Sequence, residues 1–127
     1  MVRDAPLKFT REMSGSLIIQ RVTETAITIN GNAYSQSIAL TPEEVFADWG
    51  TKTVADLAEA DFEYLLAKMP EIILLGTGRQ NVFPPRELLF AFARRGIGLE
   101  SMDTAAAART FNVLATEGRQ VAAVLYL

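Results

Sequence analysis

The chain has 127 residues, of which half are hydrophobic, and its 12 Lys and Arg against 15 Asp and Glu give a net charge of −3. This length and composition predict one domain with a sizeable apolar core. The acidic balance argues against nucleic acid as a partner, because phosphate binding requires a basic surface. No stretch approaches the roughly 20 apolar residues of a membrane-spanning helix, and we expect a cytoplasmic protein.

The sequence contains no cysteine and no histidine. The missing cysteines remove disulfides, thiol nucleophiles and four-cysteine zinc sites. The missing histidines remove the commonest general base and the commonest metal ligand. Carboxylates do not occur at the spacing of a calcium-binding EF-hand loop. The sequence therefore predicts no catalytic residue, no metal site and no cofactor. It leaves enzymatic activity open but favours a non-enzymatic role.

The N-terminal third is predicted to be antiparallel β-structure. Residues 17–22 are mostly apolar and residues 26–30 alternate between apolar and polar, as half-buried strands do. Asn30 and Gly31 are typical of a two-residue hairpin turn, after which residues 33–38 return as the partner strand. An exposed edge of this hairpin would allow pairing with another protein or self-association into a homo-oligomer.

The middle of the chain carries two helix signals. Residues 41–44 (Thr-Pro-Glu-Glu) have the form of a capping box with Pro at the first helical position, which predicts the start of a short helix. We interpret Trp49, which follows, as covering an edge of the core rather than stacking on a ligand. A second, amphipathic helix is predicted over about residues 59–69, ended by Pro70. Its apolar positions at i, i+3, i+4 and i+7 are Phe62, Leu65, Leu66 and Met69.

From residue 72 onward the pattern predicts alternating strands and helices. Residues 72–75, 98–102 and 120–127 are expected to be strands, and residues 84–95 and 104–117 helices. Three strands joined by two helices within about 55 residues indicate two right-handed crossover units of a parallel sheet. The fold class predicted from the residues is α/β.

Several motifs in this half resemble the Mth938-like family, a domain of unknown function. They are Leu75-Gly-Thr-Gly78, Gly96-Ile-Gly98, Met102-Asp-Thr104, Arg109-Thr-Phe-Asn-Val-Leu114 and Glu117-Gly-Arg-Gln-Val121. The likeness extends over about residues 15–127, and Ala108 departs from it because relatives often carry cysteine there. The resemblance implies a three-layer α/β fold with a central mixed β-sheet and helices on both faces. Together with the predicted N-terminal β-hairpin, this gives a single α/β domain over 15–127. Residues 1–14 are expected to form a loose arm without the features of a targeting leader.

The same resemblance bears on function. The family includes small bacterial proteins and a mitochondrial assembly factor for respiratory complex I, and it has no agreed catalytic residues. The resemblance therefore favours an interaction or assembly module, linked to respiratory complex assembly, with a protein partner that the sequence does not identify.

The alternative function is binding of a small anionic ligand, a phosphate or a carboxylate, at two loops that follow parallel strands. Ligands of open α/β sheets bind at the carboxyl ends of the strands, where helix N-termini point. The glycines there would let backbone approach an anion, and Arg79 adds a full charge. A tight turn with a solvated Arg79 is the competing interpretation. The candidate residues in the two loops are Gly76, Thr77, Gly78, Arg79, Asp103 and Thr104.

The helix that follows Asp103 carries a polar stripe. Asp103 itself is predicted to cap this helix rather than to act as a general base. Arg109, Asn112 and Thr116 are spaced to share one face. Arg109 is the last candidate ligand-binding residue, and an ion pair, for example with Glu117, is the alternative; Asn112 is interpreted as structural. The packing face comprises Ala107, Ala108, Phe111, Leu114 and Ala115.

Overall fold

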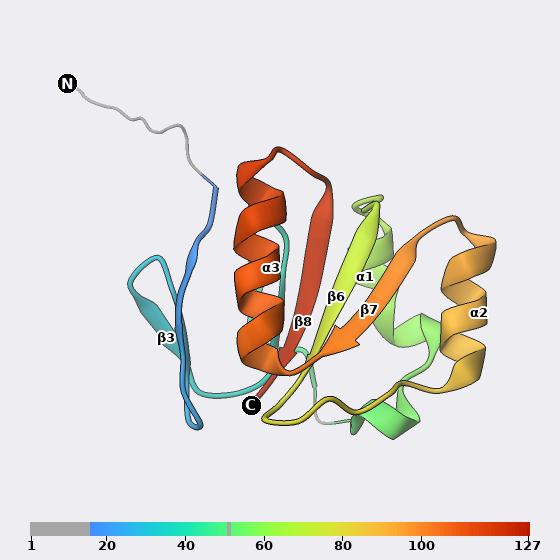
Figure 1. The fold of residues 1–127 in the computed structure, drawn as a ribbon, viewed down its shortest axis with the longest axis horizontal. Helices are drawn as coiled ribbons and strands as arrows, with labels where there is room; N and C mark the ends of the chain where they lie inside the picture. Colours follow the sequence, from blue (N-terminus) through green and yellow to red (C-terminus); the bar gives the residue numbers. More distant parts are fainter. Residues whose placement is uncertain (1–15, 51) are drawn as a thin grey trace.

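The computed structural model describes residues 16–50 and 52–127, and the arm predicted over residues 1–14 lies outside them. The first strands form a small antiparallel sheet in the order β1-β2-β3. Figure 1 shows this sheet beside the long helix α3. Its strands are β1 (Ile19–Val22), β2 (Ile27–Ile29) and β3 (Asn32–Tyr34).

The predicted hairpin is confirmed. Asn30 and Gly31 have φ angles of 47° and 87°, and the flanking residues Ile29 and Asn32 are paired. A two-residue hairpin turn whose twist matches that of the flanking strands requires positive φ at both central residues. The return strand is shorter than expected, because β3 ends at Tyr34 and the chain then crosses into a second sheet.

The second sheet has five strands in the order β5-β4-β8-β6-β7. Strand β6 lies between β8 and β7 and runs parallel to both, whereas β4 is antiparallel to β5 and β8. The sheet is therefore mixed, as expected, with its three parallel strands drawn from the C-terminal half. The strands are β4 (Ile38–Leu40), β5 (Val45–Phe46), β6 (Ile72–Thr77), β7 (Gly98–Met102) and β8 (Val121–Tyr126).

Both faces of the five-stranded sheet are covered. Successive side chains of a strand point to opposite faces. Accordingly, Leu74 of β6 packs in one apolar cluster with Phe111 of α3, and its neighbour Leu75 packs in another with Phe62 and Phe92. The three-layer α/β fold is thus confirmed (Figure 1). The helical elements are η1 (Val54–Asp56), η2 (Glu59–Phe62), α1 (Glu63–Leu66), α2 (Arg86–Arg94) and α3 (Thr104–Thr116).

The helix expected after Thr41 is absent, and that prediction is wrong. The Thr41 hydroxyl oxygen accepts the N–H groups of Glu43 and Glu44, both at 3.3 Å, and the Thr41 N–H donates to the Glu44 carbonyl at 2.9 Å. These bonds close a turn, after which Val45 pairs with Leu40 as β5. The hydroxyl makes the bonds of a helix cap, but the chain uses them to reverse direction between two strands.

The helix expected over residues 59–69 is shorter than predicted. It comprises η2 and the single turn α1, and Met69 has a φ of 56° with 80% of its surface exposed. The positions Phe62 and Leu65 are buried as the period requires. Within the described residues, no helix has the length and apolar character needed to cross a membrane.

Candidate functional site

The two loops predicted to hold a ligand are joined by hydrogen bonds. The Gly78 N–H donates to the Thr104 hydroxyl oxygen at 2.8 Å, and the Thr104 N–H donates to the Gly78 carbonyl at 2.8 Å. The Thr104 hydroxyl in turn donates to the Tyr126 carbonyl at 2.6 Å, and Thr104 is only 2% exposed. The end of β6, the start of α3 and the end of β8 therefore meet at one buried hydroxyl.

The prediction that Gly76 and Thr77 lie in the loop is wrong, because both are the last residues of strand β6, where each has structural contacts. A Cβ atom on Gly76 would lie 2.9 Å from the Thr104 Cα, so glycine permits the close approach of α3 to the sheet. The Thr77 hydroxyl donates to the Gln80 carbonyl at 2.5 Å and accepts the Val82 N–H at 2.9 Å. These bonds fold the loop that follows the strand.

The remaining four loop residues border one cavity. Gly78, Arg79, Asp103 and Thr104 line a hollow of about 520 Å³ together with the β1–β2 turn and the end of β8. Glu24, in that turn, pairs with Arg79 at 3.1 Å, and both side chains are more than 70% exposed. An ion pair this exposed contributes little stability, because water screens it. Arg79 can therefore exchange Glu24 for another anion at small cost.

Asp103 caps α3 as predicted. Its Oδ1 accepts the Ala106 N–H at 2.8 Å, which occupies one of the free donors at the start of the helix. The walls of the cavity thus carry one guanidinium group, on Arg79, and two carboxylates, on Glu24 and Asp103. An anion bound here would lie beside both carboxylates, so the contact with Arg79 has to outweigh that repulsion.

Arg109 lies outside this cavity. It is exposed and lines a neighbouring hollow of about 220 Å³ between β1 and α3. Among the ion pairs of the described residues, none joins Arg109 to Glu117. Asn112, one turn further along, is structural as interpreted, because its side-chain amide bonds both backbone groups of Ile19.

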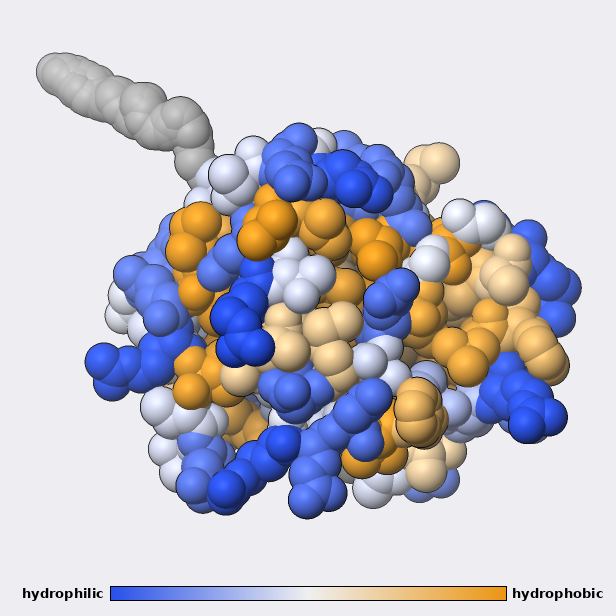
Figure 2. Space-filling model, in the orientation of Figure 1, coloured by the Kyte–Doolittle hydropathy of each residue, from blue (hydrophilic) through white to orange (hydrophobic). Residues whose placement is uncertain are grey.

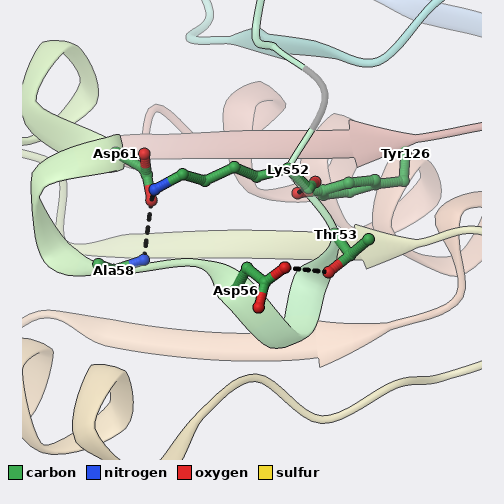
Figure 3. Close-up of polar contacts among 6 residues, drawn as sticks. All are labelled: Lys52, Thr53, Asp56, Ala58, Asp61 and Tyr126. Carbon is green, nitrogen blue, oxygen red and sulfur yellow. Dashed lines mark hydrogen bonds and ion pairs between the residues drawn. The ribbon is translucent and has the colours of Figure 1, made fainter.

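A polar cluster that the sequence did not indicate lies near the end of β8 (Figure 3). The Asp61 carboxylate accepts from the Lys52 Nζ at 3.1 Å and from the Ala58 N–H at 2.8 Å. The Tyr126 hydroxyl donates to the Lys52 carbonyl at 2.8 Å. The only local signal in the sequence is Asp61, a carboxylate three residues after Ala58. This spacing is that of a capping box, but the cap position holds alanine in place of the usual hydroxyl residue.

The cluster shifts two ionisation equilibria. Burial alone would raise the pKa of Asp61, but the bonds from Ala58 and Lys52 outweigh it and hold the pKa below the ordinary 3.8. Burial raises the pKa of Tyr126 above its ordinary 10.0. Both groups therefore keep their usual charge at neutral pH, with Asp61 ionised and Tyr126 protonated. Across the described residues, His, Cys, Asp and Glu form no group of three or more that would suit a metal ion.

Exposed apolar side chains gather on α2 and the loop before it. Phe83 and Phe90 are 76% and 56% exposed, and Val82 and Leu89 are more than one third exposed. Figure 2 shows apolar surface over α2, at the right of the view. Large apolar groups on a surface are typical of a place where another protein binds.

Comparisons with known proteins establish the family. Residues 19–126 match the model of the family described as "Protein of unknown function (DUF498/DUF598)", and the chain belongs to this family. A solution structure from Xanthomonas campestris has a TM-score of 0.81 and 37% identity, covering 94% of this chain and 92% of that one. A Mth938-like domain from Bordetella pertussis has a TM-score of 0.76 and 28% identity, covering 94% and 91%. The resemblance seen in the sequence motifs is thereby confirmed.

A named relative is also similar along most of the chain. NADH dehydrogenase [ubiquinone] 1 alpha subcomplex assembly factor 3 from Homo sapiens is 34% identical over 117 residues, which cover 91% of this chain. The matched part is 63% of the human protein, so the chain spans less than two thirds of that relative.

Proposed function

We propose that this chain is a non-enzymatic protein-binding module that assists the assembly of a multi-subunit respiratory complex. The observation that carries the proposal is the 34% identity, over 91% of the chain, to a protein named as an assembly factor of NADH dehydrogenase. The absence of histidine and cysteine from the whole sequence supports a binding role over catalysis.

The exposed apolar side chains of residues 82–90 are the proposed contact surface. Aromatic side chains carry much of the binding energy in protein interfaces, because they bury large areas with few rotatable bonds. Phe83 and Phe90 are the two most suitable anchors, since each leaves more than half of its surface to solvent. Leu88 and Phe92 of the same helix are buried in the core, so α2 would be held rigidly while its outer side binds.

In-cell cross-linking with a tagged chain in its native host tests this proposal. We expect the wild-type chain to capture subunits of the respiratory NADH dehydrogenase, and the Phe83→Ser/Phe90→Ser double variant to lose them. Val113→Ser is the control, because Val113 is an apolar side chain as exposed as Phe90, at 56%, but lies on α3. Capture of no such subunit by the wild-type chain, or full capture by the double variant, would contradict the proposal.

The second candidate function is binding of a small phosphate or carboxylate at the cavity beside Arg79. Its volume of about 520 Å³ supports this alternative, because small-molecule sites typically enclose roughly 300–1,000 Å³. A thermal-shift titration with inorganic phosphate and with citrate tests it. We expect stabilisation that disappears in Arg79→Ala and persists in Arg119→Ala, a matched exposed arginine paired with Glu71. Stabilisation that survives Arg79→Ala would exclude this site.

Self-association and a cytoplasmic location remain predictions. Strand β3 forms one edge of the small sheet, with Asn32 and Ala33 exposed. Light scattering coupled to size exclusion would detect a dimer formed through this edge. A strand of three residues offers few pairing groups, so we expect any such dimer to dissociate on dilution.

A further inference from the structure

A small cavity lies at the opposite edge of the five-stranded sheet from β7, where β5 and the segment after it face η2 and α1. Its volume is about 160 Å³. Three aromatic rings and three carboxylates line it, the remaining lining residues are aliphatic, and no lysine or arginine is among them. The six are Phe46, Trp49, Tyr64, Asp48, Asp61 and Glu63.

Two aromatic side chains that line this cavity, Phe46 and Trp49, pack against the apolar core. Trp49 packs edge-on against the fully buried Phe62, with ring centroids 5.2 Å apart and planes at 61°. Phe46 and Tyr64 stack at 6.4 Å with planes at 25°. Trp49 and Phe46 are half-buried, whereas Tyr64 is 79% exposed. The cavity therefore has two fixed aromatic walls and a third at its mouth.

The carboxylates give the cavity a negative charge. Lys52 pairs with Asp61 at 3.1 Å from outside the cavity and balances that carboxylate. Asp48 and Glu63 are exposed, and no ion pair among residues 16–50 and 52–127 includes either of them. With Asp61 balanced by Lys52, the lining residues keep two negative charges, on Asp48 and Glu63, beside three aromatic side chains. Such a combination attracts a cation and disfavours an anion.

We propose that this cavity binds the guanidinium group of an arginine side chain presented by a partner protein, an inference that rests on the proposed protein-binding function. A guanidinium group is planar, stacks on aromatic faces and donates paired hydrogen bonds to carboxylates, so it uses both kinds of wall. The volume of about 160 Å³ suits one side chain and falls short of the roughly 300 Å³ at which small-molecule sites begin. Strand β5 has two residues and, among the described strands, pairs with β4 alone, so a partner segment can approach along this edge.

The fluorescence of Trp49 tests the proposal directly, because Trp49 lines the cavity and is the only tryptophan in the chain. The probes are N-acetylargininamide and its neutral isostere N-acetylcitrullinamide, titrated at constant ionic strength. We expect saturable binding of the arginine probe in the millimolar range and at least about fivefold weaker binding of the citrulline probe. Equal affinity for the two probes would overturn the proposal, because the charge would then contribute nothing.

Two variants locate the binding. Tyr64→Ala and Glu63→Gln should each weaken the arginine probe by about two- to fivefold, and both positions are exposed, so the fold should persist. Glu43→Gln is the control, since Glu43 is an exposed carboxylate that does not line the cavity. Unchanged affinity in both cavity variants would place the probe elsewhere and overturn the inference. If the arginine probe binds but the chain captures no respiratory subunits, the arginine site is supported and the assembly function is rejected. If the chain captures respiratory subunits but the arginine probe does not bind, only the arginine site is rejected.

Discussion

The side chain of Asn112 bonds the backbone of Ile19 as a neighbouring strand would. Its Oδ1 accepts the Ile19 N–H at 2.9 Å, and its Nδ2 donates to the Ile19 carbonyl at 2.9 Å. The two residues are 93 positions apart in the sequence, on α3 and β1. One amide group therefore joins the small N-terminal sheet to the helix that packs on the central sheet.

Replacing Asn112 by alanine should destabilise the fold. The substitution leaves the N–H and the carbonyl of Ile19 without partners at a partly buried position, at a cost of about 1–3 kcal/mol. Urea denaturation should show a lower midpoint with an unchanged slope. Val113→Ala serves as the control, because Val113 is the next residue and is 56% exposed. Equal midpoints for Asn112→Ala and the wild-type chain would show that the pairing contributes nothing to stability.

Thr104→Val should cost about 2 kcal/mol, although the two side chains have nearly the same shape. The valine methyl group can neither accept the Gly78 N–H nor donate to the Tyr126 carbonyl, and both groups lose the partner that Thr104 supplies. Thr116→Val tests the same exchange at an exposed position of the same helix, where an effect within about 0.5 kcal/mol is expected. Similar thermal midpoints for the two variants would contradict the role of the buried hydroxyl.

Gly76→Ala should destabilise the chain more than Gly98→Ala does. The added Cβ at position 76 would meet the Thr104 Cα at 2.9 Å and the Ala107 Cβ at 3.1 Å, so α3 would have to move away from β6. Overpacking of this kind costs about 1–3 kcal/mol. The Cβ at position 98 would meet only Ile72 atoms, at 3.5 Å or more, which is ordinary contact. Circular dichroism melts of both variants make the comparison, and an equal loss at both positions would contradict it.

Asp61 should contribute stability that depends on pH. Burial opposes ionisation of this group, but the Ala58 N–H and Lys52 outweigh it, so its pKa is lower in the folded chain than in the unfolded one. The contribution is then fully present above the unfolded pKa near 3.8 and is lost as the pH falls through the folded pKa. Urea midpoints of the wild-type chain and Asp61→Asn should differ at pH 7 and converge below about pH 4. A difference that does not change with pH would contradict the ionic role.

Local patterns in the sequence predicted much of the fold. The positive-φ turn at Asn30–Gly31, the buried strand at β6 and the cap at Asp103 each depend on residues within a few positions, and all three are confirmed. The prediction of a helix after Thr41 is wrong because the same hydroxyl bonds can also close a turn. Val45 then pairs with Leu40, so the chain continues as a strand.

The surroundings of the candidate sites depend on distant residues, which periodicity does not reveal. Nothing near Arg79 in the sequence indicates that Glu24 pairs with it, 55 positions away. Asn112 was recognised as structural, but its partner lies in the first strand. The cavity at Trp49 likewise forms only when β5 is folded against α1. The packing interpretation of Trp49 agrees with its contact to Phe62, and Trp49 also lines the cavity.

The amount of assembled respiratory NADH dehydrogenase in membranes of the native host tests the assembly function most directly. The gene for the chain would be deleted, and the complex quantified on native gels by its NADH-oxidising activity. We predict a reduced amount after deletion, recovery with the wild-type chain, and no recovery with Phe83→Ser/Phe90→Ser, provided that immunoblots show equal levels of both chains. An unchanged amount of assembled complex in the deletion strain would contradict the proposed function.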